Sequence, residues 1–149
     1  MSTIDQVVAY AAKVHRRVWA KGTDVSGQTC KAQKVCKQWQ EQVIEKFGDR
    51  FRAEMPLNES GPSQKIDIVD LKARVAYELK SSPNNVHMEI YRDVFKALVF
   101  NERNSETAIR KLVFVAPSEG VRRLGRTFPK DVQKIAAKVG LKLEIRELP

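Results

Sequence analysis

The 149-residue sequence has only two cysteines and two histidines. The separation of Cys30 from Cys36 matches no usual spacing of zinc ligands, and neither His15 nor His87 is placed to complete such a site. We therefore expect two reduced thiols, with Cys36 packed on a helix face, and no structural metal.

The sequence also lacks an apolar run long enough to cross a bilayer, and its first residues lack the basic-then-apolar pattern of a secretory signal. These absences favour an intracellular, cytoplasmic protein with no membrane partner. No Ser-His-Asp or Cys-His nucleophile, phosphate-binding glycine loop or dinucleotide fingerprint is recognisable. The apolar fraction of 42% and the charged fraction of 30% are typical of one folded domain spanning residues 1–149.

The sequence has fewer acidic than basic residues, with 18 Asp and Glu against 27 Lys and Arg, and its net charge is +9. The excess is largest between Arg110 and Arg146, where ten basic residues stand against Glu119, Asp131 and Glu144. Such an excess favours a polyanionic partner, and DNA or RNA first. A solvated basic face that aids solubility is the alternative.

Apolar spacing and turn signals predict the order helix, helix, three strands, helix, strand, helix, strand. This order is typical of an α/β domain with a mixed central sheet flanked by helices. We expect an N-terminal helix and loop over residues 1–28 and an α-β-β-β-α-β-α-β core over residues 29–149. The expected segments are helices over 4–22, 30–48, from 86 onward and 129–140, strands over 50–55, 66–69, 75–80, 111–116 and 141–148, and a loop over 117–128.

The second and third strands form a hairpin if residues 71–74 make its turn. A symmetric pairing then places Asp67 opposite Glu78, at a Cβ separation of about 4.5–5.5 Å. Alternation puts Asp67, Glu78 and Lys80 on one face of the pair, and Ile66, Ile68, Tyr77 and Leu79 on an apolar face. The turn lacks the Gly or Asn of a tight hairpin, and a slip of one residue would bring Asp70 into the site instead.

Adjacent carboxylates suit a hard cation such as Mg²⁺, which takes oxygen ligands and keeps several waters. The ion can polarise a phosphoryl oxygen and lower the pKa of a bound water. A lysine two residues after Glu78 would point into the same site, where it could orient that water or neutralise developing charge. The alternative is that Asp67, Glu78 and Lys80 line a solvated strand face.

An acid on one strand followed by Glu-x-Lys on the next, between a helix and a strand-helix crossover, resembles the PD-(D/E)XK nuclease superfamily. The resemblance runs from about Thr29 to Leu148, although Ile66 replaces the proline of the family name. It implies a restriction-endonuclease-like fold and a Mg²⁺-dependent DNA endonuclease, of restriction, junction-resolving or repair type, in which Mn²⁺ can substitute. Asp67 and Glu78 would then be metal ligands, Lys80 the catalytic lysine, and Glu41 or Glu45 a further ligand, with Glu41 preferred.

Several residues outside the hairpin are candidates for DNA contacts or auxiliary roles. Arg122, Arg123, Arg126 and Lys130 are expected to contact DNA phosphates, unless they are simply solvated. His87 could serve as an auxiliary base, although a surface histidine is the simpler reading. Cutting both strands of a duplex needs two active sites, so a homodimer is expected by analogy. A non-catalytic nucleic-acid-binding subunit with the same fold is the alternative function.

Overall fold

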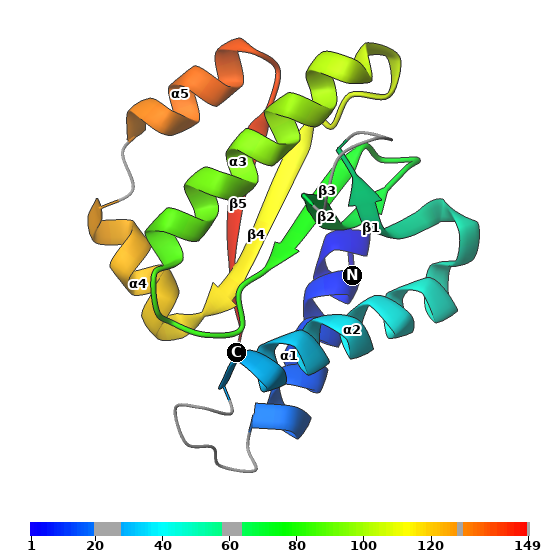
Figure 1. Ribbon diagram of the computed structural model, residues 1–149, viewed down its shortest axis with the longest axis vertical. Coiled ribbons are helices and arrows are strands. Elements are labelled where there is room, and N and C mark those ends of the chain that lie inside the picture. Colours follow the sequence, from blue (N-terminus) through cyan, green and yellow to red (C-terminus); the bar gives the residue numbers. More distant parts are fainter. Residues whose placement is uncertain (20–27, 58–63, 128–129, 149) are drawn as a thin grey trace.

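The computed structural model describes residues 1–19, 28–57, 64–127 and 130–148. Its centre is a five-stranded mixed sheet in the order β1-β2-β3-β4-β5 (Figure 1). The first three strands pair antiparallel, whereas β3, β4 and β5 run parallel, so crossover helices connect the last three. The strands are β1 (Phe51–Pro56), β2 (Lys65–Asp70), β3 (Val75–Leu79), β4 (Lys111–Pro117) and β5 (Lys142–Leu148).

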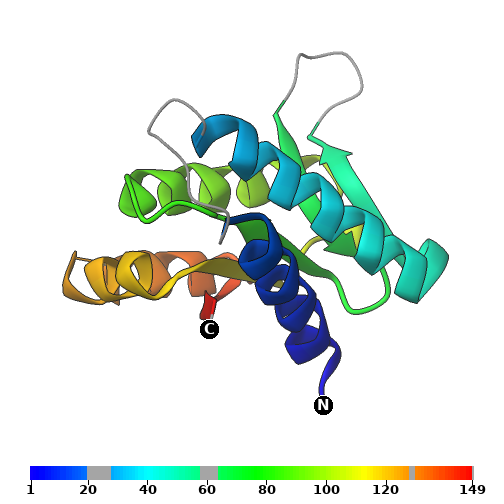
Figure 2. The ribbon, with the colours of Figure 1, turned by 90° about the horizontal axis from the view of Figure 1, so that it is seen from below.

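Two groups of helices cover the sheet, one to the left and one to the right of it in Figure 1. One group holds α1 and α2, which lie against each other, and the other holds α3, α4 and α5 (Figure 2). The α/β class with a mixed, helix-flanked sheet is therefore confirmed. The helices are α1 (Thr3–Trp19), α2 (Gln28–Phe47), α3 (Val86–Arg103), α4 (Ser118–Thr127) and α5 (Lys130–Lys138), with 3₁₀ turns at Gly48–Arg50 and Ser105–Thr107.

Each face of the sheet has its own apolar cluster. The cluster under α1 and α2 includes the fully buried Trp39, whose indole N–H donates to the Val7 carbonyl at 3.0 Å and so joins the two helices. The cluster under α3, α4 and α5 includes Phe114 of β4 and Leu124 of α4. Because α1 buries Val7 and Val14 against the core, it is part of the same packed unit as residues 29–149. Within the described residues, no helix combines the length and apolarity needed to span a membrane.

The prediction of a loop over residues 117–128 is wrong, because Ser118–Thr127 form the helix α4. Glycine is common in turns and the segment contains two, but Gly120 instead permits close packing. A Cβ built at Gly120 would lie 2.7 Å from Cγ2 of Val86, at the start of α3. The glycine therefore marks a helix–helix contact, which a local reading cannot distinguish from a turn.

The predicted hairpin register is confirmed, since Ile68 pairs with Tyr77 and Asp70 pairs with Val75. The turn forms without glycine: Arg74 adopts the left-handed conformation, with a φ of +57°, and the fully buried Asp70 holds the turn together. Its Oδ1 accepts from the backbone N–H groups of Lys72 and Ala73 at 3.1 and 3.0 Å. The same carboxylate binds Arg50 through two hydrogen bonds of 3.0 and 2.6 Å. Asp70 is thus held by the turn, and no slip carries it into the site.

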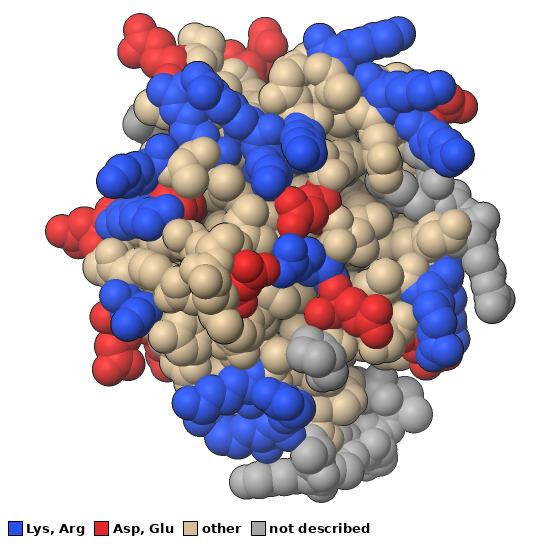
Figure 3. Space-filling view, turned by 180° about the vertical axis from the view of Figure 1, so that it is seen from behind, with Lys and Arg blue, Asp and Glu red and all other residues tan. Residues whose placement is uncertain are grey.

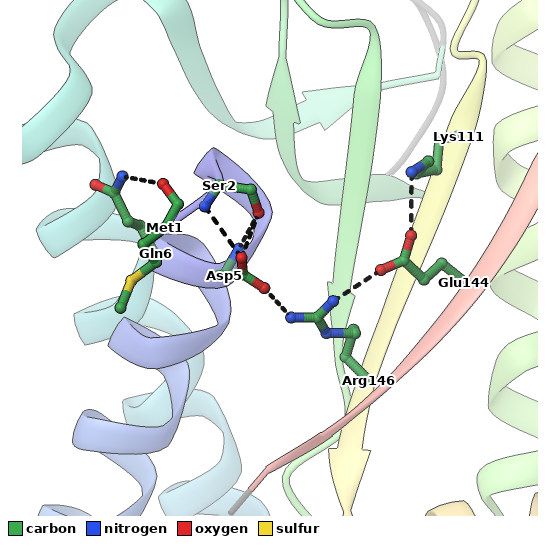
Figure 4. Close-up of polar contacts among 7 residues, drawn as sticks. All are labelled: Met1, Ser2, Asp5, Gln6, Lys111, Glu144 and Arg146. Atoms are coloured by element: carbon green, nitrogen blue, oxygen red, sulfur yellow. Dashed lines mark hydrogen bonds and ion pairs between the residues drawn. The ribbon is translucent and has the colours of Figure 1, made fainter.

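A polar chain fastens the start of α1 to the parallel half of the sheet (Figure 4). Arg146 of β5 donates to Asp5 on one side and to Glu144 at 3.1 Å on the other. Glu144 in turn accepts from Lys111 of β4 at 3.0 Å. The hydrogen bond from the Ser2 hydroxyl, followed by the Arg146 contact, lowers the pKa of Asp5 to about 2.

We expect Asp70→Ala to lower the free energy of unfolding by about 3 kcal/mol, because it removes the buried partner of Arg50 and the oxygen that accepts both hydrogen bonds of the turn. Urea denaturation of purified protein measures the change. Asp49→Ala, an exposed acid just before β1, is the matched control and should stay within about 0.5 kcal/mol of wild type. Equal effects of the two substitutions would contradict the role assigned to Asp70.

The lowered pKa of Asp5 predicts that the protein loses folding stability at acidic pH. Its pKa is lower in the fold than in the unfolded chain, so its contribution is present above pH 4 and is lost as the pH falls toward about 2. Asp5→Asn should therefore be less stable than wild type at neutral pH, and the two melting curves should converge between pH 4 and 2. A gap that persists unchanged at pH 2 would refute this assignment.

Candidate active site

The strands β2 and β3 separate immediately after the Ile68–Tyr77 pair, and we call the resulting opening the fork. There the backbone N–H of Leu79 donates to Oδ2 of Asp67 at 2.9 Å, in place of a strand carbonyl. On its other side β3 stays attached to β4, since Lys80 N–H donates to the Val115 carbonyl at 2.8 Å. The fork therefore places the Asp67 carboxylate beside the end of β3.

The apolar face predicted for the hairpin is wrong for one residue. Ile68 packs under α1 and α2, whereas Ile66 packs in the cluster under α3. The cause is an interruption of the pleat: β1 and β2 pair on either side of Glu54 and Asp67 but not at them, and Glu54 has a φ of +50°. The alternation of side chains between the two faces of the sheet fails at that point. Asp67 therefore lies between Ile66, which faces α3, and Ile68, which faces α1 and α2.

Glu78 points toward α3, since it shares its register position with Phe114 of the α3-side cluster. It is 3% exposed, which excludes the solvated strand face considered from the sequence. Two residues of α3 meet it there: Lys96, 6% exposed, and Asp93, 4% exposed. The Lys96 Nζ lies 2.6 Å from Oε1 of Glu78 and 3.1 Å from Oδ1 of Asp93.

Asp67 has neighbours on β3 and on α2. The Glu78 carboxyl and the Cys36 thiol of α2 are close enough for the charge of Asp67 to raise the pKa of each. Gln40 of α2 also donates to the Asp67 backbone carbonyl at 3.0 Å. The fork thus places Asp67 near Glu78, as the hairpin pairing predicts.

The electrostatics of the fork are those of acids crowded away from water. Burial, followed by the negative charges of Asp67 and Asp93, raises the pKa of Glu78 well above its ordinary value. Burial also raises the pKa of Asp67, and it raises that of Asp93 to about 6. Burial acts to lower the pKa of Lys96, but the charges of Glu78 and Asp93 outweigh it and raise the pKa. The carboxyls accordingly favour a proton or a nearby cation.

Two buried oxygens of this cluster face the same cation. Oε1 of Glu78 and Oδ1 of Asp93 lie 2.6 and 3.1 Å from the Lys96 ammonium, and apart from it neither oxygen has a hydrogen-bond partner among the described residues. Adjacent carboxylates of this kind fit Mg²⁺, whose remaining positions water can fill. Within the described ranges, however, no three His, Cys, Asp or Glu side chains are already arranged as a ligand set.

Lys80 lies on the α3 side of β3, as its spacing from Glu78 predicts, but its Nζ is directed to Glu89 at 3.6 Å. Its side chain is 22% exposed. The lysine that contacts Glu78 is therefore Lys96 and not Lys80.

The other predicted site residues lie farther out. Glu41 and Glu45 are exposed and line a groove of about 950 Å³ between α2 and β1, and Gln40 is the neighbour that reaches Asp67. His87 is exposed in the first turn of α3.

The predicted DNA-contacting residues lie on two helices of the α3 group. Arg122 and Arg123 are exposed on α4, where Arg123 pairs with Glu119 at 2.5 Å. Lys130 is exposed at the start of α5, and the side chain of Arg126 falls outside the described residues. On the face seen in Figure 3, Lys and Arg form separate groups with acids between them. The net positive charge is thus spread over that face and does not form one continuous patch there.

Asp93 and Lys96 are site residues that the sequence analysis missed. The signal was present, because both fall among Ile90, Val94 and Ala97 on the buried side of α3. Charged residues three apart within an apolar helix stripe indicate a buried ion pair. The spacing does not show which strand this pair faces.

Comparison with protein-family models, curated proteins and solved structures finds no match for this chain. The resemblance to PD-(D/E)XK nucleases therefore stays a prediction that depends on the residues of the fork.

The Cys36 thiol offers a probe of the fork. Burial and the charges of Asp67 and Glu78 raise its pKa, so iodoacetamide at pH 8.5 should label the exposed Cys30 first and Cys36 much more slowly. Asp67→Asn should speed labelling of Cys36 by up to about tenfold, the change in thiolate for a pKa shift of about one unit. Peptide mass spectrometry measures both rates, with Cys30 as internal control. An unchanged Cys36 rate would contradict the contact with Asp67.

Proposed function

We propose that this protein is a divalent-metal-dependent endonuclease that hydrolyses phosphodiester bonds of DNA at the fork. The observation that carries the proposal is the gathering of acids at the fork, where Asp67 accepts from Leu79, the residue next to Glu78, and the 3% exposed Glu78 also lies near Asp93. Buried carboxyls of this kind are costly unless a cation compensates them, and Mg²⁺ or Mn²⁺ is a cation that such oxygens bind well.

Asp67 and Glu78 would hold the ion, and the hydrogen bond from Leu79 would fix the Asp67 carboxylate in place. A divalent ion supplies Lewis acidity and a bound water of lowered pKa. Lys80 would bring its ammonium to the substrate side, where it orients the water or offsets charge on the phosphoryl group. Its partial exposure and its 3.6 Å contact with Glu89 leave it free to turn toward a bound phosphate.

The exposed cations of α4 and α5 would hold the DNA backbone. Arg122, Arg123 and Lys130 project from helices on the same side of the sheet as Glu78, so a duplex that contacts them can approach that side. Arg126 would belong to the same group by its position in α4. Phosphate contacts of this kind fix the position of the DNA without reading its sequence.

Double-strand cleavage, whether by a restriction, junction-resolving or repair enzyme, would require a homodimer with two forks. A cytoplasmic location is part of the same proposal. A non-catalytic nucleic-acid-binding subunit is the second candidate, and the contact of Lys96 with Glu78 favours it, because an internal cation can make a carboxylate cluster purely structural.

Cleavage of supercoiled plasmid and of a four-way junction, with Mg²⁺, Mn²⁺ or chelator, separates these candidates. We expect metal-dependent cutting by the wild type. Glu78→Gln and Lys80→Met should each reduce the rate by about a hundredfold or more, because they remove a metal ligand and a transition-state charge.

Lys111→Gln is the matched control for both variants, because it removes a lysine from a Lys–Glu pair outside the fork, that of Lys111 with Glu144. Its cleavage rate should equal that of the wild type. DNA binding without cleavage in any metal would refute the enzyme and support the non-catalytic subunit. Cleavage that survives Glu78→Gln would show that the reaction occurs elsewhere.

A further inference from the structure

Lys96 joins three elements at the fork. Its ammonium donates to the Lys65 carbonyl of β2 at 2.8 Å and lies 2.6 Å from Glu78 of β3 and 3.1 Å from Asp93 of its own helix. Lysine is rarely so buried unless it compensates a charge. The position of Lys96 is therefore defined by the carboxylates around it.

The charges at the fork do not balance. Asp67, Glu78 and Asp93 can carry three negative charges, against the single positive charge of Lys96. Arg92 approaches Asp93 only to 3.7 Å, and its side chain is 56% exposed, so water screens most of its effect. An additional cation would complete the balance.

Besides its hydrogen bond to the Lys65 carbonyl, the Lys96 ammonium faces Oε1 of Glu78 and Oδ1 of Asp93. Apart from this ammonium, neither oxygen has a hydrogen-bond partner among the described residues. Mg²⁺ binds such oxygens at about 2.0–2.1 Å, closer than an ammonium approaches. An ion on the same oxygens and the Lys96 charge must therefore repel each other.

We propose that Lys96 is a built-in counter-ion of the carboxylate cluster, and that a divalent ion binds at Glu78 and Asp93 in competition with it. The inference deepens the proposed function and rests on its metal site, to which it adds Asp93 as an acidic ligand from α3. Lys96 stabilises the metal-free fold, and the same positive charge weakens metal binding.

The competition predicts two effects of opposite sign. Lys96→Met, and Lys96→Gln, which keeps a donor for the Lys65 carbonyl, should both lower the melting temperature in chelator. Both should bind Mn²⁺ at least about tenfold more tightly than wild type, because a positive charge a few ångströms from the ion is gone. Titration calorimetry and the EPR signal of free Mn²⁺ measure the affinity without DNA or turnover. Asp93→Asn should bind Mn²⁺ more weakly.

Lys111→Gln, which removes a lysine from the Lys111–Glu144 pair of Figure 4, is the control and should leave Mn²⁺ affinity unchanged. Equal or weaker Mn²⁺ binding by both Lys96 variants overturns the inference and makes Lys96 a positioning residue. A Lys96 variant that folds only with Mn²⁺ supports it, and one that stays unfolded with Mn²⁺ overturns it. If the wild type binds no Mn²⁺ that Glu78→Gln removes, the metal site and the proposed function fail together.

Discussion

The architecture around the fork depends on the cost of holding three carboxyl groups away from water. Asp67, Glu78 and Asp93 come from two strands and one helix, and in their ionised forms they repel one another unless a positive charge lies between them. Lys96 supplies that charge at 2.6 Å from Glu78, and it also hydrogen-bonds to the backbone of β2. The packing of α3 on β2 and β3 is therefore electrostatic as well as apolar.

The sheet provides the opening in which these charges meet. Antiparallel pairing brings Asp67 next to Glu78, but it stops one residue earlier, and the Asp67 carboxylate takes the backbone N–H of Leu79. Glu54 of β1, which has no register partner in β2 and has a φ of +50°, lies at the same level. Interruptions of this kind cost energy and persist where the surrounding structure holds them. Here α2 and α3 both contact β2, so the irregular point is enclosed by regular elements.

Local patterns predicted the α/β class, the order of helices and strands along the chain, and the hairpin register, because apolar periodicity and turn symmetry depend on neighbouring residues. They failed where a distant contact decides the structure: Gly120 suited close helix packing, and Ile66 changed sides beside the interrupted pleat. The turn after Asp70 is held by its side-chain oxygen Oδ1, which accepts from two backbone N–H groups. A prediction that looks only for Gly or Asn in the turn does not consider such a contact. Asp93 and Lys96 were missed for the same reason, since their spacing shows a buried pair but not the strand that it faces.

The two lysines at the end of β3 differ in burial, and burial determines what each can do. The ammonium of Lys80 remains partly hydrated and pairs loosely with Glu89, so reorienting it toward the phosphate of the proposed substrate would cost little. Lys96 is fixed among acids, and moving it would leave them uncompensated. If the proposed divalent ion binds beside it, the charge that stabilises the metal-free protein is the charge that the ion must overcome. Stability and metal affinity at the fork would then be linked through one side chain, and a substitution that improves one would weaken the other.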